Sequence, residues 1–284
     1  MIRGLIFDLD GTIYRGAEQV PGAAQTIRFL RTHSIKCLFV TNRANRTPEE
    51  IAEHLRSYGI PCAPDEVLTS AQVAARHLAG RSAYCIGEHG LTSALAAAGI
   101  VITDDRPDCV IVSFDRSFSY EKLKKAVRLV RAGSKFVATN LDAYIQLEDG
   151  VWPGTGAIAA AIEMASGTKP VVMGKPEPLI FRMALEKMEL AAAEVINVGD
   201  NLATDIPAGL RAGIRSALIL TGVSSRAEAA SGPCRPTWIV EGCPDLVRLV
   251  CHENSLPVPP DFDGAQARLM ADPPRPASPD QAGN

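Results

Sequence analysis

Two carboxylates stand one residue apart near the start of the chain, at the end of the apolar run 5–7. They are Asp8 and Asp10, and Gly11 follows them. Side chains alternate along an extended strand, so both carboxylates would lie on one side, and Gly11 allows a sharp turn after them. Like charges this close require a cation. The alternative is that Asp10 and Gly11 form an ordinary solvated acidic turn.

A second pair of carboxylates, Asp200 and Asp205, follows the apolar run 195–198. Hard divalent cations take carboxylate oxygens as ligands, so Asp200 could complete a metal site with the first pair. Alternatively, Asp200 caps a helix over 202–212, and Asp205 is a first-turn acid favoured by the helix dipole. The two interpretations are compatible.

Polar groups that could hold phosphate oxygens follow two further apolar runs. Thr41 and Asn42 close the run 37–40, and Lys175 stands after the run 171–173 with a proline behind it. A residue before proline favours an extended loop, and a hydroxyl, a backbone N–H and an ammonium are phosphate donors. Each alone could be a turn or a surface residue. Their order and their shared position at strand ends indicate one site.

The elements that would position these residues alternate between short apolar runs and helical patterns, which is typical of parallel sheets with crossover helices. The expected strands are residues 5–7, 37–40, 83–86, 110–112, 136–138, 171–173, 195–198 and 217–220. Thr47, Pro48 and Glu50 form an N-terminal capping pattern, and Gly59 ends that helix. Similar signals frame helices over 70–80 and 119–133. The fold class is α/β, with enough strands for two sheets.

Composition narrows the class of protein. The 284 residues carry 29 Lys+Arg against 32 Asp+Glu, a net charge of −3, with 46% hydrophobic and 5% aromatic residues. A globular protein of about two domains fits this length, whereas a nucleic-acid partner or a membrane-embedded chain does not fit the charge and patterning. The final segment 255–284 holds 7 of the 20 prolines and predicts a mostly disordered tail.

Cysteines and histidines show no metal-ligand spacing. The seven cysteines form no C-x-x-C pair, which indicates reduced thiols, and the first apolar run is too short for a signal peptide, so we expect a cytoplasmic protein. Neither Gly-x-x-x-x-Gly-Lys nor Gly-x-Gly-x-x-Gly occurs. Phosphate binding would therefore have to use the carboxylate and metal site.

Taken together, the four motifs resemble those of the haloacid dehalogenase-like (HAD) superfamily of magnesium-dependent phosphotransferases. They are Asp8-Leu9-Asp10-Gly11-Thr12, Thr41-Asn42, Lys175, and Gly199-Asp200 with Asp205, in the superfamily's order. Further strings resemble its p-nitrophenylphosphatase/NagD-type branch, which carries a type-two cap. They are Ser113-Phe114-Asp115-Arg116, Ala138-Thr139-Asn140-Leu141-Asp142 and Pro153-Gly154-Thr155-Gly156.

The resemblance implies a Rossmann-like, doubly wound parallel-sheet core with an inserted α/β cap domain. The core would comprise residues 1–75 and 174–254, and the cap residues 76–173. It also implies a phosphatase of small phosphate monoesters of the nucleotide, phosphoglycolate or sugar phosphate type. A phosphomutase or another phosphotransferase of the superfamily, or a non-catalytic binder of phosphoryl groups and metal, remains the alternative.

The resemblance also assigns roles to residues. Asp8 would be the nucleophile and form an aspartyl-phosphate, Asp10 the general acid and base, and Lys175 a stabilising cation. Mg²⁺ would be held by Asp8, Asp200 and the backbone carbonyl of Asp10.

Other residues would support these groups or bind the substrate. Thr41, rather than Thr139 of the cap, would bind the phosphoryl oxygens together with Asn42. Asp205 and Asn201 would hold the residues of the site in position without being the primary ligands. Cap loops around Asp115, Asn140 and Asp142 would contact the leaving group, with Asn140 and Asp142 as substrate-binding residues. Caps of this type imply a homodimer.

One position departs from the pattern of this branch. Arg43 stands where a second small amide is usual, and Arg46 follows shortly after. Arg43 is expected either to bind substrate, which would favour a second anionic group, or to point to water with Arg46.

Overall fold

The computed structural model describes residues 1–147 and 149–262. Its larger sheet has six strands in the order β15-β14-β13-β1-β4-β5, and every neighbouring pair is parallel. The strands are β1 (Gly4–Phe7), β4 (Lys36–Thr41), β5 (Val67–Thr69), β13 (Val195–Gly199), β14 (Arg215–Ile219) and β15 (Trp238–Val240). This is the doubly wound parallel sheet that the sequence predicts.

Helices cover both faces of this sheet because its strands are apolar on both sides. Leu5 and Phe7 pack into one hydrophobic cluster, and Ile6 packs into another. Helices of the first face are α1 (Ala23–Thr32), α2 (Pro48–Ser57) and α10 (Cys243–Asn254). Helices of the second face are α3 (Ser70–His77), α7 (Leu179–Met188) and α8 (Asp205–Arg211). The helix α9 (Arg226–Ser231) packs beside β14 and β15.

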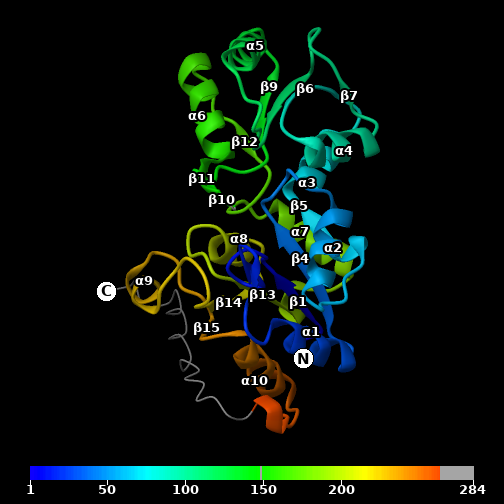
Figure 1. Cartoon of the computed structure of the whole chain (residues 1–284), viewed down its shortest axis with the longest axis vertical. Helices are drawn as coiled ribbons and strands as arrows, with labels where there is room; N and C mark the ends of the chain where they lie inside the picture. The colour runs from blue at the N-terminus through cyan, green and yellow to red at the C-terminus, as the bar shows by residue number, and fades with distance from the viewer. Residues whose placement is uncertain (148, 263–284) are drawn as a thin grey trace, which may run out of the picture.

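A second parallel sheet lies above the first in Figure 1, with the order β12-β9-β8-β6-β7. Its strands are β6 (Ser82–Ile86), β7 (Val101–Ile102), β8 (Cys109–Val112), β9 (Lys135–Ala138) and β12 (Val171–Val172). The helices α5 (Tyr120–Arg131) and α6 (Thr155–Ser166) cover one face of this sheet. On the other face, α4 (His89–Ala97) shares a hydrophobic cluster with α3 and the larger sheet.

Shorter elements complete the structure. They are the antiparallel pairs β2 (Tyr14–Arg15) with β3 (Glu18–Gln19) and β10 (Tyr144–Leu147) with β11 (Gly150–Pro153), and the 3₁₀ turns η1 (Pro64–Glu66), η2 (Ala192–Glu194) and η3 (Pro260–Phe262). No helix in the described ranges is long and apolar enough to cross a membrane.

The start of the expected disordered tail is ordered. Leu256, Val258 and Phe262 pack against the main hydrophobic cluster, and the ring centroid of Phe262 lies 5.8 Å from that of Phe29. Residues 255–262 of the segment expected to be mostly disordered are thus packed, because three apolar side chains among the prolines cover a hydrophobic surface. The rest of the expected tail, residues 263–284, lies outside the described residues.

Candidate active site

The candidate site lies where the direction of the larger sheet reverses. From β1 the chain proceeds outward through β4 and β5 on one side, then returns to β13 and proceeds through β14 and β15 on the other. A parallel sheet wound in both directions leaves a crevice at the carboxyl ends of the two central strands. Asp8 follows β1 and Asp200 follows β13, and these strands are paired neighbours. The topology thus brings together carboxylates that are distant in sequence.

Lys175 links two of the carboxylates. Its Nζ contacts Oδ1 of Asp8 and lies 2.6 Å from Oδ1 of Asp205, and all three residues are buried. Burial alone would lower the pKa of Lys175, but Asp205 and Asp8 together raise it, so the ammonium stays charged. Asp205 is held in turn, because its Oδ2 accepts a hydrogen bond from the backbone N–H of Asn201 at 3.1 Å. Asn201 therefore acts through its backbone.

Asp200 adds a third buried carboxylate, 3% exposed. Its Oδ2 accepts a hydrogen bond from the backbone N–H of Val223 at 2.6 Å. Burial, and then the charge of Asp205, raise the pKa of Asp200 to about 7, and burial likewise raises the pKa of Asp8. A single ammonium thus faces three carboxylates, and protons or a further cation must neutralise the excess.

The donor set fits Mg²⁺. Asp8, Asp200 and Asp205 each offer an oxygen, and these oxygens lie within 4.8 Å of one another. Both oxygens of Asp205 already accept hydrogen bonds, one from Lys175 and one from Asn201. Asp8 and Asp200 are therefore the side chains best placed to bind a hard divalent cation, and oxygen ligands from one or two carboxylates are what Mg²⁺ takes in proteins.

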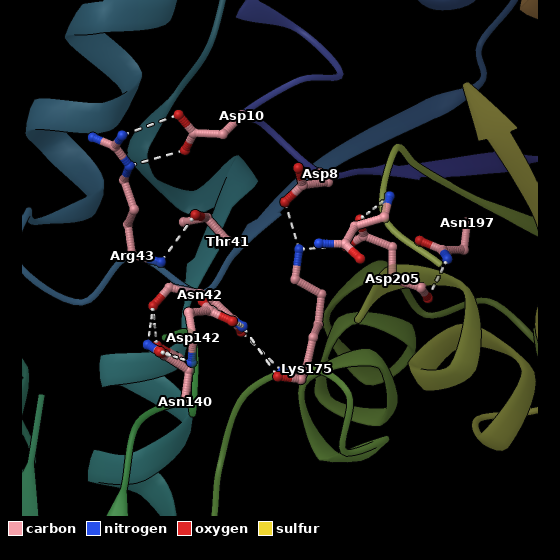
Figure 2. Close-up of polar contacts among 12 residues, drawn as sticks. Asp8, Asp10, Thr41, Asn42, Arg43, Asn140, Asp142, Lys175, Asn197 and Asp205 are labelled. Atoms are coloured by element: carbon pink, nitrogen blue, oxygen red, sulfur yellow. Dashed lines mark hydrogen bonds and ion pairs between the residues drawn. The ribbon is translucent and has the colours of Figure 1, made fainter. Parts of the chain in front are cut away.

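Asn42 joins the two sheets at this site. Its Nδ2 donates to Oδ2 of Asp142 at 3.1 Å and to the carbonyl of Lys175 at 3.1 Å, and its Oδ1 accepts from the Lys175 N–H at 2.9 Å. Its carbonyl accepts from Nδ2 of Asn140 at 2.9 Å. Asn140 and Asp142 thus contact Asn42 in this structure (Figure 2). Burial raises the pKa of Asp142, although the Asn42 amide opposes this.

Arg43 forms a two-point ion pair with Asp10. Its Nη2 donates to Oδ1 of Asp10 at 3.0 Å, and its Nε lies 2.9 Å from Oδ2. The backbone N–H of Arg43 donates to Oγ1 of Thr41 at 3.0 Å. Figure 2 shows the Asp10 carboxylate turned toward Arg43, whereas Asp8 faces Lys175. The Arg43 side chain therefore does not point to water, and its guanidinium is already paired with a carboxylate of the protein. That carboxylate is Asp10, the second acid of the first motif.

A cavity of about 410 Å³ contains all of these groups. The residues that the sequence predicts for the site and that line this cavity are Asp8, Asp10, Thr41, Asn42, Arg43, Asn140, Asp142, Lys175, Asp200, Asn201 and Asp205. Thr139 is not among the lining residues. Asp115 is not among them either, because it accepts hydrogen bonds from Lys122 Nζ and Ser117 in the segment from β8 into α5. Its neighbour Phe114 does line the cavity, so the loop around Asp115 reaches the site through another side chain.

Sequence reasoning missed two parts of the site. Apolar side chains of the loops after β8 and β9 and of the β10–β11 hairpin also line the cavity, among them Phe114, Leu141, Tyr144 and Ile145. The loop after β14, residues 221–224, contacts the Asp200 side chain. The signal that could have indicated this loop is Thr221 and Gly222, which directly follow the expected strand 217–220.

Comparison with known proteins agrees with this geometry. Residues 5–101 match the family model described as haloacid dehalogenase-like hydrolase, and residues 172–246 match a second model described as HAD-hydrolase-like. The acid sugar phosphatase of Staphylococcus saprophyticus is 39% identical over 251 residues, which is 87% of this chain and 97% of that protein.

Two solved structures are similar over most of the chain. NagD from E. coli K-12 superposes with a TM-score of 0.82 at 38% identity, over 86% of this chain and 97% of NagD. The glycerol phosphate phosphatase of Mycobacterium tuberculosis, solved in complex with magnesium, gives a TM-score of 0.82 at 36% identity, over 86% of this chain and 76% of that one.

The chain belongs to the haloacid dehalogenase-like hydrolase family. Within the family it falls in the branch that contains NagD and the 4-nitrophenylphosphatases, and its enzyme class is that of the phosphoric monoester hydrolases acting on small molecules. The family, the fold class and the enzyme class predicted from the sequence are confirmed.

Proposed function

We propose that this phosphatase is magnesium-dependent and hydrolyses small phosphate monoesters through a covalent aspartyl-phosphate on Asp8. The observation that carries the proposal is the buried contact of Lys175 Nζ with Asp8 beside Asp200, in a cavity with room for a small ester. Asp8, Asp200 and the backbone carbonyl of Asp10 would hold Mg²⁺, which would supply positive charge to offset the repulsion between a carboxylate nucleophile and a phosphate dianion.

The residues of the chain divide the reaction into two halves. In the first, an Asp8 oxygen bonds to phosphorus, the ester P–O bond breaks, and the Asp10 carboxyl gives its proton to the leaving oxygen. In the second, water attacks phosphorus, Asp10 takes a proton from that water, and the Asp8–phosphorus bond breaks to release phosphate. Lys175, Thr41 and the N–H of Asn42 stabilise the charge on the phosphoryl oxygens.

The leaving group is enclosed by residues 76–173, which we propose as a cap inserted into a core of residues 1–75 and 174–254. This division is supported by the two separate parallel sheets and by the second-sheet residues that line the cavity, such as Leu141 and Tyr144. A cavity of about 410 Å³ lined by residues of both sheet units favours small esters of the nucleotide, phosphoglycolate or sugar phosphate type over phosphoproteins. The names of two relatives, acid sugar phosphatase and glycerol phosphate phosphatase, support such substrates.

A cytoplasmic homodimer without a nucleic-acid partner is part of the proposal. The seven cysteines are all free thiols, which suits a reducing compartment, and the net charge of −3 does not favour binding to the phosphate backbone of nucleic acids. Val101 and Ile102 of the edge strand β7 are exposed and could face a second copy. Light scattering on the purified chain tests the dimer, and a monomer mass at micromolar concentration would contradict it.

The test of the function is phosphate release from p-nitrophenyl phosphate, nucleoside monophosphates, phosphoglycolate and sugar phosphates, with Mg²⁺ or with EDTA. We expect turnover that EDTA abolishes and that Asp8→Asn lacks. Turnover that survives EDTA would contradict metal dependence. Transfer of the phosphoryl group to another hydroxyl of the substrate, without release of phosphate, would identify a mutase.

A further inference from the structure

The loop of residues 221–224 leads from β14 toward α9 and contacts both carboxylate motifs. Oγ1 of Thr221 donates to the carbonyl of Gly11 at 2.6 Å, across 210 residues of sequence. The backbone N–H of Val223 donates to Oδ2 of Asp200 at 2.6 Å, and that of Ser224 donates to the Asp200 carbonyl at 3.1 Å. One short segment therefore ties the turn after β1 to the loop after β13.

Gly222 lets this loop approach the Asp200 carboxylate. A Cβ atom on Gly222 would lie 1.9 Å from Oδ2 of Asp200, far inside van der Waals contact. Gly11 approaches the same oxygen from the other motif, with a Cβ position 2.4 Å away and φ of +81°. The carboxylate thus occupies a slot between two glycines, and neither position can take a side chain without displacing it.

The hydrogen bonds and the two-glycine slot restrict different motions of the Asp200 carboxylate and of the backbone after Asp10. The Val223 N–H occupies one oxygen of Asp200 and the two glycines limit rotation of the carboxylate, while Thr221 holds the peptide next to the Asp10 carbonyl. Those two groups, the Asp200 carboxylate and the Asp10 carbonyl, come from different strands and must be held at a fixed separation to share one ion. Groups that orient metal ligands in this way change metal affinity when they are removed.

We propose that the 221–224 loop is a positioning element of the metal site, which presets Asp200 and the Asp10–Gly11 backbone for Mg²⁺ and thereby determines the affinity for the ion. This inference rests on the proposed function, in which Asp200 is a metal ligand. The loop is not itself a ligand. Its effect is on the dissociation constant of Mg²⁺, whereas the KM for substrate at saturating Mg²⁺ does not depend on it.

The experiment is calorimetric titration of the full chain with Mg²⁺ in the absence of substrate. Thr221→Val removes the hydroxyl at nearly constant volume, and Thr221→Ser is its matched control because it keeps the hydroxyl. We expect Thr221→Val to weaken Mg²⁺ binding about tenfold, with Thr221→Ser close to wild type. Gly222→Ala is expected to weaken binding by at least that factor, and circular dichroism checks that each variant is folded.

The outcomes separate the loop from the function. If wild type binds Mg²⁺ and Thr221→Val and folded Gly222→Ala bind it equally well, the loop inference is overturned while the proposed function stands. If Thr221→Val fails to fold, Thr221→Ala is titrated in its place under the same expectation. If wild type binds no Mg²⁺, the proposed metal dependence fails and the loop inference fails with it.

Discussion

Lys175 is the residue on which the charge balance of the site depends. It is 3% exposed, contacts Asp8 and Asp205, and neutralises one of three buried carboxylates. A buried charge is tolerated only when it is paired, so burial, and then the neighbouring carboxylates, keep the pKa of Asp8 and Asp200 high and favour binding of a cation. The excess of buried carboxylates, which is unfavourable without a metal ion, is thus suited to binding one.

For Arg43, the structure identifies an interaction partner that the sequence left open. Because it pairs with both oxygens of Asp10, we expect Arg43→Gln to disorder the general acid. An alkoxide leaves only when protonated, whereas p-nitrophenolate leaves without help, so kcat/KM for glycerol phosphate should fall about tenfold or more and that for p-nitrophenyl phosphate about threefold at most. Steady-state kinetics on both esters measures the difference.

Arg46→Gln is the control, since Arg46 is a neighbouring arginine outside the cavity lining. Equal losses on the two esters would mean that Arg43 binds the phosphate itself instead of positioning Asp10. The sequence could indicate that Arg43 was unusual but could not assign its partner. The direction of that side chain depends on how residues 42–46 lie against β1, which no local pattern encodes.

At the scale of elements, parallel strands position the site and their apolar runs were readable. All eight expected strands exist, because buried parallel strands appear as continuous apolar runs. The missed strands β5, β7 and β15 have two or three residues each, too short to show a period, and the β10–β11 hairpin carries mixed polarity. The carboxyl ends of the longer strands were therefore predictable, whereas the β10–β11 hairpin that lines part of the cavity was not.

The connection from β8 to α5 contains a buried carboxylate whose effect on stability depends on pH. Burial alone would raise the pKa of Asp115, but hydrogen bonds from Lys122 at 2.6 Å and from Ser117 at 2.7 and 2.9 Å lower it below its ordinary 3.8. The ionised form is thus favoured in the folded state. Its contribution is present above the unfolded pKa and is lost as pH falls through the lower folded value.

Asp115→Asn should therefore lower the free energy of unfolding by about 1–3 kcal/mol at pH 7, as for a hydrogen bond to a charged group. Thermal unfolding at pH 7 and below pH 4 checks this, and the gap from wild type should narrow only below about pH 4. Asp105→Asn, at an exposed carboxylate in the loop between β7 and β8, is the control. A gap of equal size at both pH values would show that packing, not charge, is responsible.

Across the whole molecule, the two sheets are joined by apolar packing and by polar contacts, among them the Asn42 contacts at the cavity. The cluster around Ile6 continues through α3 and α4 to Ile111 of the second sheet, and Asn42 links Asp142 to the Lys175 backbone at the cavity. Substrate bound at Asp8 would therefore lie against both halves. The sequence predicted two units but not this junction, because contacts between segments 100 residues apart leave no periodic signal.

The segment after α10 stabilises the end of the molecule opposite the second sheet in Figure 1. Phe262 packs on Phe29 of α1, and its carbonyl accepts from Arg248 Nη1 at 2.6 Å. Phe262→Ala should lower the free energy of unfolding by about 2 kcal/mol, less than for a fully buried ring. Urea unfolding measures it, with Tyr120→Ala, at a ring 78% exposed, as the control. No loss for Phe262→Ala would mean that the contact is unimportant in solution.

In the proposed mechanism, the phosphoryl group passes through a covalent bond to Asp8. Asp10→Asn removes the base for the second half-reaction but leaves p-nitrophenolate able to depart, so the phosphoenzyme should accumulate. The measurement is acid quenching of Asp10→Asn with p-nitrophenyl phosphate and Mg²⁺, followed by mass spectrometry of the digested chain. We predict a stoichiometric burst of nitrophenolate and a phosphoryl group on the peptide that contains Asp8. A burst without a covalent adduct, or an adduct on another residue, would contradict the mechanism.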